Sequence, residues 1–198
     1  MAKSDNVLKK EVRAELNRKG CKKIGYIDFL LVDKKIFLTF FTTALGKVET
    51  TVEIRYVSLN EFAFYLDEYG TSYSGRNLVG EFPGELKIPN SLHVSGAASL
   101  GLFGGTVRHV LENEDVETFV ATCLDEGSAL LEKYRDMMPS LRASLEQNPP
   151  ADYAITVATF VGEFQRARQI VESRREDDGG FLGHVPRQAD RYLRDLGF

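Results

Sequence analysis

The spacing of apolar residues divides the chain into a first part typical of strands and a second part typical of helices. The N-terminal segment is the exception, because apolar residues recur there every three or four positions, at Val7, Leu8, Val12 and Leu16. Residues 22–58 change to a pattern rich in aromatic and β-branched side chains, which is typical of strands. We therefore expect one amphipathic helix followed by an antiparallel β-meander.

Three strands are predicted within the meander, separated by turns at Asp33-Lys34-Lys35 and Gly46-Lys47. The first is KKIGYIDFLLVD, the second is IFLTFFTTAL and the third is VETTVEIRYV. The third strand alternates apolar and polar residues, which is typical of an antiparallel strand with one buried face. The second strand is apolar at nearly every position, and this predicts a central place in the sheet.

Helical spacing returns after the meander. The box Ser58-Leu59-Asn60-Glu61 predicts a short helix, and residues 70–107 look irregular, with GELKI as a candidate strand. From Asn113, the expected N-cap, the chain reads as helical, and Pro139 is expected to break or kink it. A helical hairpin that turns at Gly162-Glu163 and a last helix from Pro186 complete the pattern.

These elements predict an α+β fold, in which helices pack on a small antiparallel β-meander sheet. The C-terminal half is helical and ends in an αα-hairpin and a terminal helix. A chain of 198 residues is long enough for one substantial core. We expect a single domain over residues 1–198, with an α/β meander part (1–110) and a helical part (111–198).

Charge is distributed unevenly, although the net charge is only −4. Residues 1–25 carry eight lysines and arginines against three acidic residues, whereas residues 110–147 carry nine acidic residues against three basic ones. Such runs are typical of solvated helix faces, and they also suit a partner of opposite charge. A nucleic acid is a less favoured partner, because the basic first helix, with Lys9, Lys10 and Arg13, lacks interleaved aromatic residues.

The location expected from the sequence is the cytoplasm. Cys21 and Cys123 form neither a disulfide framework nor a zinc motif, and the first residues contain no apolar secretory region. The uncharged run over residues 88–107 has too few apolar residues for a membrane span. It is not a phosphate-binding loop either, because Leu102 and Phe103 stand where a Walker A motif requires Lys and Ser or Thr.

The loop over residues 70–109, together with an acidic or basic face, is the predicted contact surface. The apolar tips of its uncharged run are expected to dock on the protein's own core or on another chain, and two arginines flank this run. The residues expected to bind a partner are Tyr73, Arg76, Leu100, Leu102, Phe103, Arg108 and His109.

No metal-binding or hydrolase motif occurs in the sequence, so no cofactor, metal or catalytic residue is predicted. Two alternatives stay open. One is an enzyme acting on nucleic acid or a nucleotide, in which His109 works with Glu112 or Asp115. The other is a small-ligand binder with a pocket between the sheet and the helices.

The order of elements also resembles a bacterial family of uncharacterised soluble α+β domains, over roughly residues 5–175. The resemblance is carried by NRKGCKKIG, FLLVDKKIFLTFF, TTVEIRYV, NEDVETFVATCLDEGSALLEKY and FVGEFQRA. Some relatives in that family lie near polymorphic toxin genes, and the family implies no reaction. Together with the missing catalytic motifs, this favours a non-catalytic cytoplasmic protein-binding module of immunity or phage-defence type.

Overall fold

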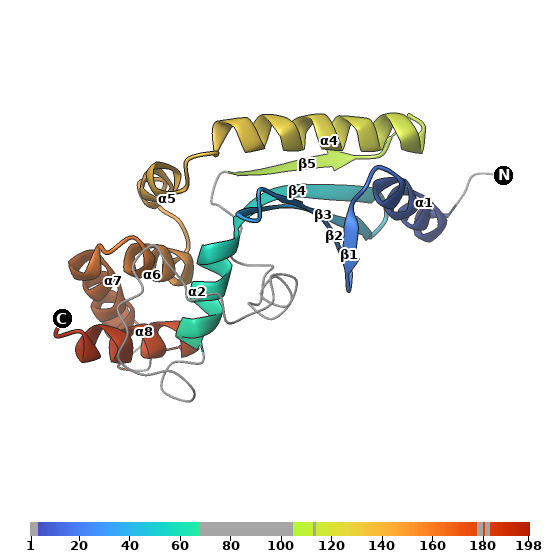
Figure 1. The fold of residues 1–198 in the computed structure, drawn as a ribbon. Coiled ribbons are helices and arrows are strands. Elements are labelled where there is room, and N and C mark those ends of the chain that lie inside the picture. Colours follow the sequence, from blue (N-terminus) through green and yellow to red (C-terminus); the bar gives the residue numbers. More distant parts are fainter. Residues whose placement is uncertain (1–3, 68–104, 113, 178–179, 181–182) are drawn as a thin grey trace. The chain divides into compact units, whose positions relative to one another are not determined.

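The protein has an α+β fold, as the sequence predicts, with an antiparallel sheet of five strands and helices that dominate the C-terminal half. A computed structural model describes residues 4–67, 105–112, 114–177, 180 and 183–198. The chain forms two compact units (Figure 1). A sheet unit comprises residues 1–56 and 105–135, and a helical unit comprises residues 57–104 and 136–198.

The sheet unit contains the antiparallel meander and two helices. Its strands follow the order β1-β2-β3-β4-β5, and every neighbouring pair is antiparallel. The prediction that the apolar strand is central is confirmed, since β3 lies between β2 and β4. The elements are α1 (Asp5–Arg18), β1 (Lys22–Ile24), β2 (Ile27–Val32), β3 (Ile36–Ala44), β4 (Val48–Tyr56), β5 (Thr106–Val110) and α4 (Val116–Lys133).

Two strands differ from the prediction. The expected first strand is two strands, because Gly25 adopts a φ of 55° and reverses the chain between β1 and β2. The segment predicted to be irregular up to residue 107 ends in β5, which pairs with β4. A local pattern does not reveal this strand, because its pairing partners on β4 lie 53 to 61 residues earlier in the sequence.

Helices α1 and α4 cover one face of the sheet (Figure 1). Most side chains of β3 and β4 that point to this helix-covered face are buried, among them Leu38, Phe40, Val52 and Ile54. Helix α4 approaches closely at Gly127, where a Cβ atom would lie 2.6 Å from a methyl group of Leu38. A core of the sheet unit therefore lies between this face and the two helices, and Phe29 and Phe37, which point to the opposite face, are buried as well.

A buried ion pair fixes α1 on the hairpin of β1 and β2. The Arg13 side chain donates from Nε to the Asp28 carboxylate at 2.6 Å and from Nη2 to the Gly25 carbonyl at 3.2 Å. The Asp28 side chain is 1% exposed, so its charge depends on this arginine for compensation.

The helical unit is built around aromatic side chains and consists of α2 (Val57–Asp67), α5 (Met137–Leu145), α6 (Ala151–Phe160), α7 (Phe164–Asp177) and α8 (His184–Asp195). The Phe62 ring of α2 packs on Phe160 and Tyr192, with centroid distances of 5.4 and 6.0 Å. The predicted helical hairpin is confirmed as α6 and α7, and Gly162, with a φ of 81°, turns the chain between them.

Helix boundaries refine the sequence prediction. Asn113 lies outside the described residues, and the N-cap of α4 is Asp115, whose carboxylate accepts from the Thr118 backbone N–H. Helix α4 ends before Pro139, and a new helix, α5, begins at Met137. Pro139 therefore lies in the first turn of α5, where a missing backbone N–H is tolerated.

The two units are interleaved along the chain. Helix α2 belongs to the helical unit although it lies early in the sequence, and α4 belongs to the sheet unit although it lies late. The predicted boundary between an α/β meander part (1–110) and a helical part (111–198) stays a prediction, and so does the single domain.

Candidate functional site

Five of the residues predicted to bind a partner, together with the candidate strand GELKI, lie outside the described residues: Tyr73, Arg76, Leu100, Leu102 and Phe103. The other two, Arg108 and His109, are neighbours on β5. Successive side chains of a strand point to opposite faces, so the structure does not bring these two together. Arg108 is opposite Thr51 on the face that α1 and α4 leave uncovered, which we call the second face.

His109 points to the helix-covered face, opposite the buried Thr50. Its Nε2 atom is buried and has no hydrogen-bond partner among the described residues. Both oxygens of Asp115 accept from Thr118, one from the backbone N–H and one from the hydroxyl, each at 2.9 Å. These hydrogen bonds, with that from the backbone N–H first, hold the pKa of Asp115 below its usual value. The structure therefore does not assemble His109 and Asp115 into an acid–base pair, and Glu112 is exposed.

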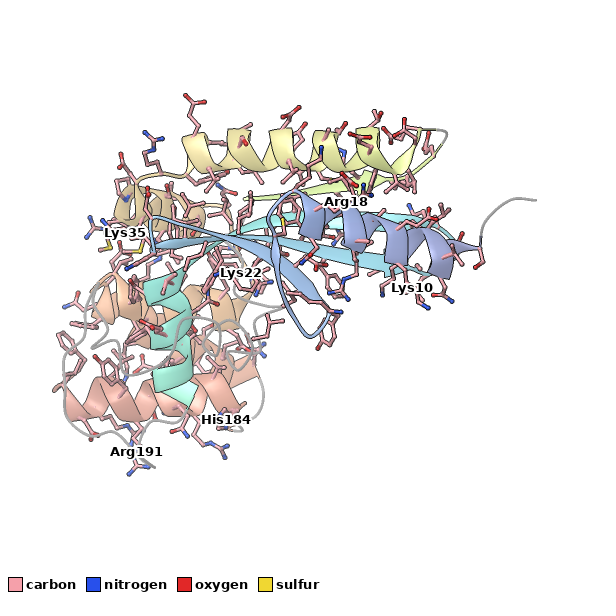
Figure 2. The ribbon with its side chains drawn as sticks, turned by 45° about the vertical axis from the view of Figure 1, so that its right-hand side comes forward. Lys10, Arg18, Lys22, Lys35, His184 and Arg191 are labelled. Atoms are coloured by element: carbon pink, nitrogen blue, oxygen red, sulfur yellow. The ribbon has the colours of Figure 1, made fainter. Side chains whose placement is uncertain are left out.

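The basic first helix presents fewer free cations than its sequence suggests. Arg13 is tied to Asp28, and Lys9 is half-buried. Lys10 is exposed on α1, as is Arg18, which forms an ion pair with the buried Glu15 (Figure 2). Of the three residues predicted to contact phosphates, Lys10 is exposed, whereas Lys9 and Arg13 are half-buried.

Two further kinds of site find no support in the described part of the chain. No group of three or more His, Cys, Asp and Glu side chains is placed there to hold a metal ion. None of the helices in that part has both the length and the apolar character needed to cross a membrane.

The two thiols are expected to be unreactive in the folded protein. Burial, with a smaller contribution from the charge of Asp28, raises the pKa of Cys21 to about 12. Burial also raises the pKa of Cys123 to about 12, helped by Glu114 and Glu126. We expect Ellman's reagent at pH 8 to label neither thiol until urea unfolds the protein. Rapid labelling of native protein would contradict this expectation.

The same two groups set a pH dependence of stability. Thiols that keep their protons in the folded state but lose them in the unfolded state favour unfolding at high pH. Their contribution is complete below pH 9, the ordinary value, and is lost as the pH rises toward 12. Urea midpoints measured from pH 8 upward should therefore fall above pH 9, and replacement of both cysteines by alanine should remove this part of the fall.

A shallow pocket of about 510 Å³ lies in the helical unit, where α7 begins and the chain ends. Phe164 and Phe198 stack there with a centroid distance of 4.7 Å. The charged groups of the pocket are already paired, since Arg166 donates to Glu146 at 2.6 Å and to the Leu145 carbonyl at 2.9 Å. This leaves few polar groups to orient a small ligand, and the small-ligand alternative stays a prediction.

An apolar patch is exposed at one end of the sheet and was not predicted from the sequence. Tyr26 is 62% exposed, Phe41 is 39% exposed and Leu45 is 88% exposed. The rings of Tyr26 and Phe41 form an edge-to-face pair with a centroid distance of 5.8 Å. These three residues, which we call the apolar patch, share one end of the sheet because Tyr26 precedes β2 and Leu45 follows β3.

Two cations flank the apolar patch on the second face. The pairing of the strands sets Ile24, Ile27, Phe41, Thr51 and Arg108 in one row across that face. Arg108 ends this row at the β5 edge, and Lys22 lies at the β1 edge in the adjacent row. Both are exposed, and neither has a carboxylate within ion-pair distance among the residues described.

No protein-family model, curated protein or solved structure matches the chain. The family resemblance therefore stays a prediction.

Proposed function

We propose that this protein is a non-catalytic protein-binding module whose contact surface is the apolar patch with its two flanking cations. The observation that carries the proposal is the exposure of Tyr26, Phe41 and Leu45 together at one end of a well-packed sheet. Large apolar side chains that gather on a surface are costly to hydrate, and a partner that covers them removes this cost.

The composition of the surface supports a protein as the partner. Tyrosine and arginine are enriched among residues that dominate binding energy, and an aromatic pair on a sheet is a rigid anchor. Rigidity lowers the entropy lost on association, because fewer side-chain rotamers have to be fixed. Lys22 and Arg108, at the two edges, favour a partner with an apolar centre and an acidic rim.

Affinity purification from the native host tests the proposal. The wild-type protein is expected to retain a partner that the double variant Tyr26→Ser with Phe41→Thr loses. Removal of two anchors should weaken binding of the identified partner by about thirtyfold or more, measured by isothermal titration calorimetry. Phe41→Thr places a β-branched residue, which favours strands, in β3, so the strand should persist.

The matched control is Phe198→Ser, which removes an exposed aromatic ring from the helical unit. It is expected to retain the same partner with unchanged affinity. Recovery of the wild-type protein alone, or equal retention by the double variant and the control, would refute the proposal.

A narrower form of the proposal is a cytoplasmic immunity-type or phage-defence-related protein that neutralises a toxin-like partner. It is supported only by the resemblance in sequence pattern. An acidic toxin-like protein among the retained partners would support it, and a housekeeping enzyme in that place would count against it.

A further inference from the structure

The outer edge of β5 presents backbone groups that no described residue pairs. The Ile54 N–H donates to the Gly105 carbonyl at 3.1 Å, and the Leu111 N–H donates to the Val48 carbonyl at 2.9 Å. In an antiparallel ladder, the backbone groups of every second residue bond to the same neighbouring strand. The backbone N–H and C=O groups of Val107 and His109 therefore also point toward β4. The N–H and C=O groups of the residues between them therefore point away from the sheet, at Thr106, Arg108 and Val110.

The two edges of the sheet differ in how they are protected. The β1 edge is only three residues long and carries two exposed lysines, Lys22 and Lys23, and both features discourage strand addition. β5 is five residues long, contains three β-branched residues, no proline and no lysine, and carries Arg108 as its charge. Among the described residues, this edge is therefore the better suited of the two to pair with another strand.

The charge of Arg108 specifies what that strand contains. Its neighbours on the second face include Glu49 and Glu53, but these carboxylates are engaged elsewhere. Glu49 pairs with Lys47 at 3.4 Å, and Glu53 accepts from Arg55 Nε at 3.1 Å. An acidic residue directly opposite Arg108 on an incoming strand would form a cross-strand ion pair.

A second copy of this chain is a poorer occupant. Two β5 strands that pair antiparallel about Arg108 set the two guanidinium groups opposite each other. Like charges in that position destabilise the pairing. Charge therefore favours a different chain with an acidic residue at the centre of its strand.

We propose that the partner binds by strand addition, laying an extended acidic segment along the outer edge of β5 as a sixth strand. This inference rests on the proposed function, since it says how the partner of the apolar patch is held. The added strand would continue the row from Phe41 through Thr51 to Arg108, so both features would act on one side of the sheet.

Two substitutions at Arg108 separate the backbone from the charge. Arg108→Thr removes the charge and keeps the outward N–H, whereas Arg108→Pro removes both. Because this N–H points away from β4, proline there breaks no bond of the existing ladder. The probe is a capped seven-residue peptide of alternating Thr and Val with a central Glu, and its control has Lys in place of Glu.

Amide hydrogen exchange and chemical-shift titration by NMR give the readout. In the free protein, the amides of Val107 and His109 should be protected, and those of Thr106, Arg108 and Val110 should exchange quickly. The Glu peptide should protect the amides of these three. Arg108→Thr and the Lys peptide should each weaken binding about threefold. Arg108→Pro should weaken binding about tenfold or more.

Three results would overturn strand addition. The first is that millimolar Glu peptide leaves the amides of Thr106, Arg108 and Val110 unprotected. The second is that the Arg108→Pro variant binds the Glu peptide as tightly as the wild-type protein does. The third is that the free protein forms a dimer in size-exclusion chromatography and that this dimer protects the same amides. Failure of the proposed function looks different, because the wild-type protein then retains no partner whatever the peptide does. A partner that is lost with Tyr26→Ser and Phe41→Thr, but kept with Arg108→Pro, would leave the protein-binding function standing and refute strand addition.

Discussion

Replacement of Arg13 by alanine is expected to lower the free energy of unfolding by about 3–5 kcal/mol. The arginine compensates a carboxylate that is almost fully buried, and its loss leaves Asp28 charged and unpaired beneath α1. The same substitution removes the hydrogen bond to the Gly25 carbonyl, which holds the turn between β1 and β2. Urea unfolding followed by circular dichroism measures the effect.

Two matched variants show whether the ion pair is the cause. Lys10→Ala removes an exposed cation from the same helix and should change stability by no more than about 0.5 kcal/mol. Arg13→Met combined with Asp28→Val replaces both partners with apolar groups and should recover most of the loss. If Arg13→Ala and Lys10→Ala behave alike, Arg13 is a surface residue, and the case for nucleic-acid binding by α1 becomes stronger.

The second large effect is expected in the helical unit. Phe62→Ala should lower the free energy of unfolding by about 3–5 kcal/mol, because it leaves a cavity between two rings that now pack against it. Phe62 is fully buried, and its contacts with Phe160 and Tyr192 join α2 to α6 and α8. Urea unfolding and the loss of amide protection in α6 and α8 are the measurements.

The control for this substitution is Phe198→Ala, which truncates a phenylalanine of the same unit that is 45% exposed. It should lose less than about 1.5 kcal/mol, since the ring is already half-exposed and the ring contact that is removed is the one with Phe164. A loss for Phe62→Ala as small as that of the control would mean that α2 does not hold this core together.

Local sequence patterns are sufficient to predict helices and strands whose packing or pairing partners are near in the sequence. The alternating pattern of β4 predicts one buried face, and Val48, Val52 and Ile54 are buried there. The apolar character of β3 predicts its central place in the sheet, which is also confirmed. The turn at Gly25 was missed because glycine inside an apolar strand pattern has more than one meaning. β5 was missed because its existence depends on pairing with a distant strand.

The candidate site was harder to predict, for a physical reason. Tyr26 and Phe41 are indistinguishable in sequence from a buried aromatic residue such as Phe40, which the register places on the helix-covered face. Only the register of the strands and the placement of the helices decide which rings remain exposed. Arg108 was predicted from its position beside an uncharged run, but the separation of its side chain from that of His109 follows only once β5 is recognised as a strand.

The interleaving of the two units has a consequence for biosynthesis. A ribosome delivers β4 long before β5, so the nascent sheet has a nine-residue strand at its open border until residue 110 emerges. That strand is rich in valine, threonine and isoleucine and therefore prone to pair with other nascent chains. A truncated product that stops before residue 105 is thus expected to aggregate, and no single proteolytic cut can release either unit as one continuous, complete fragment.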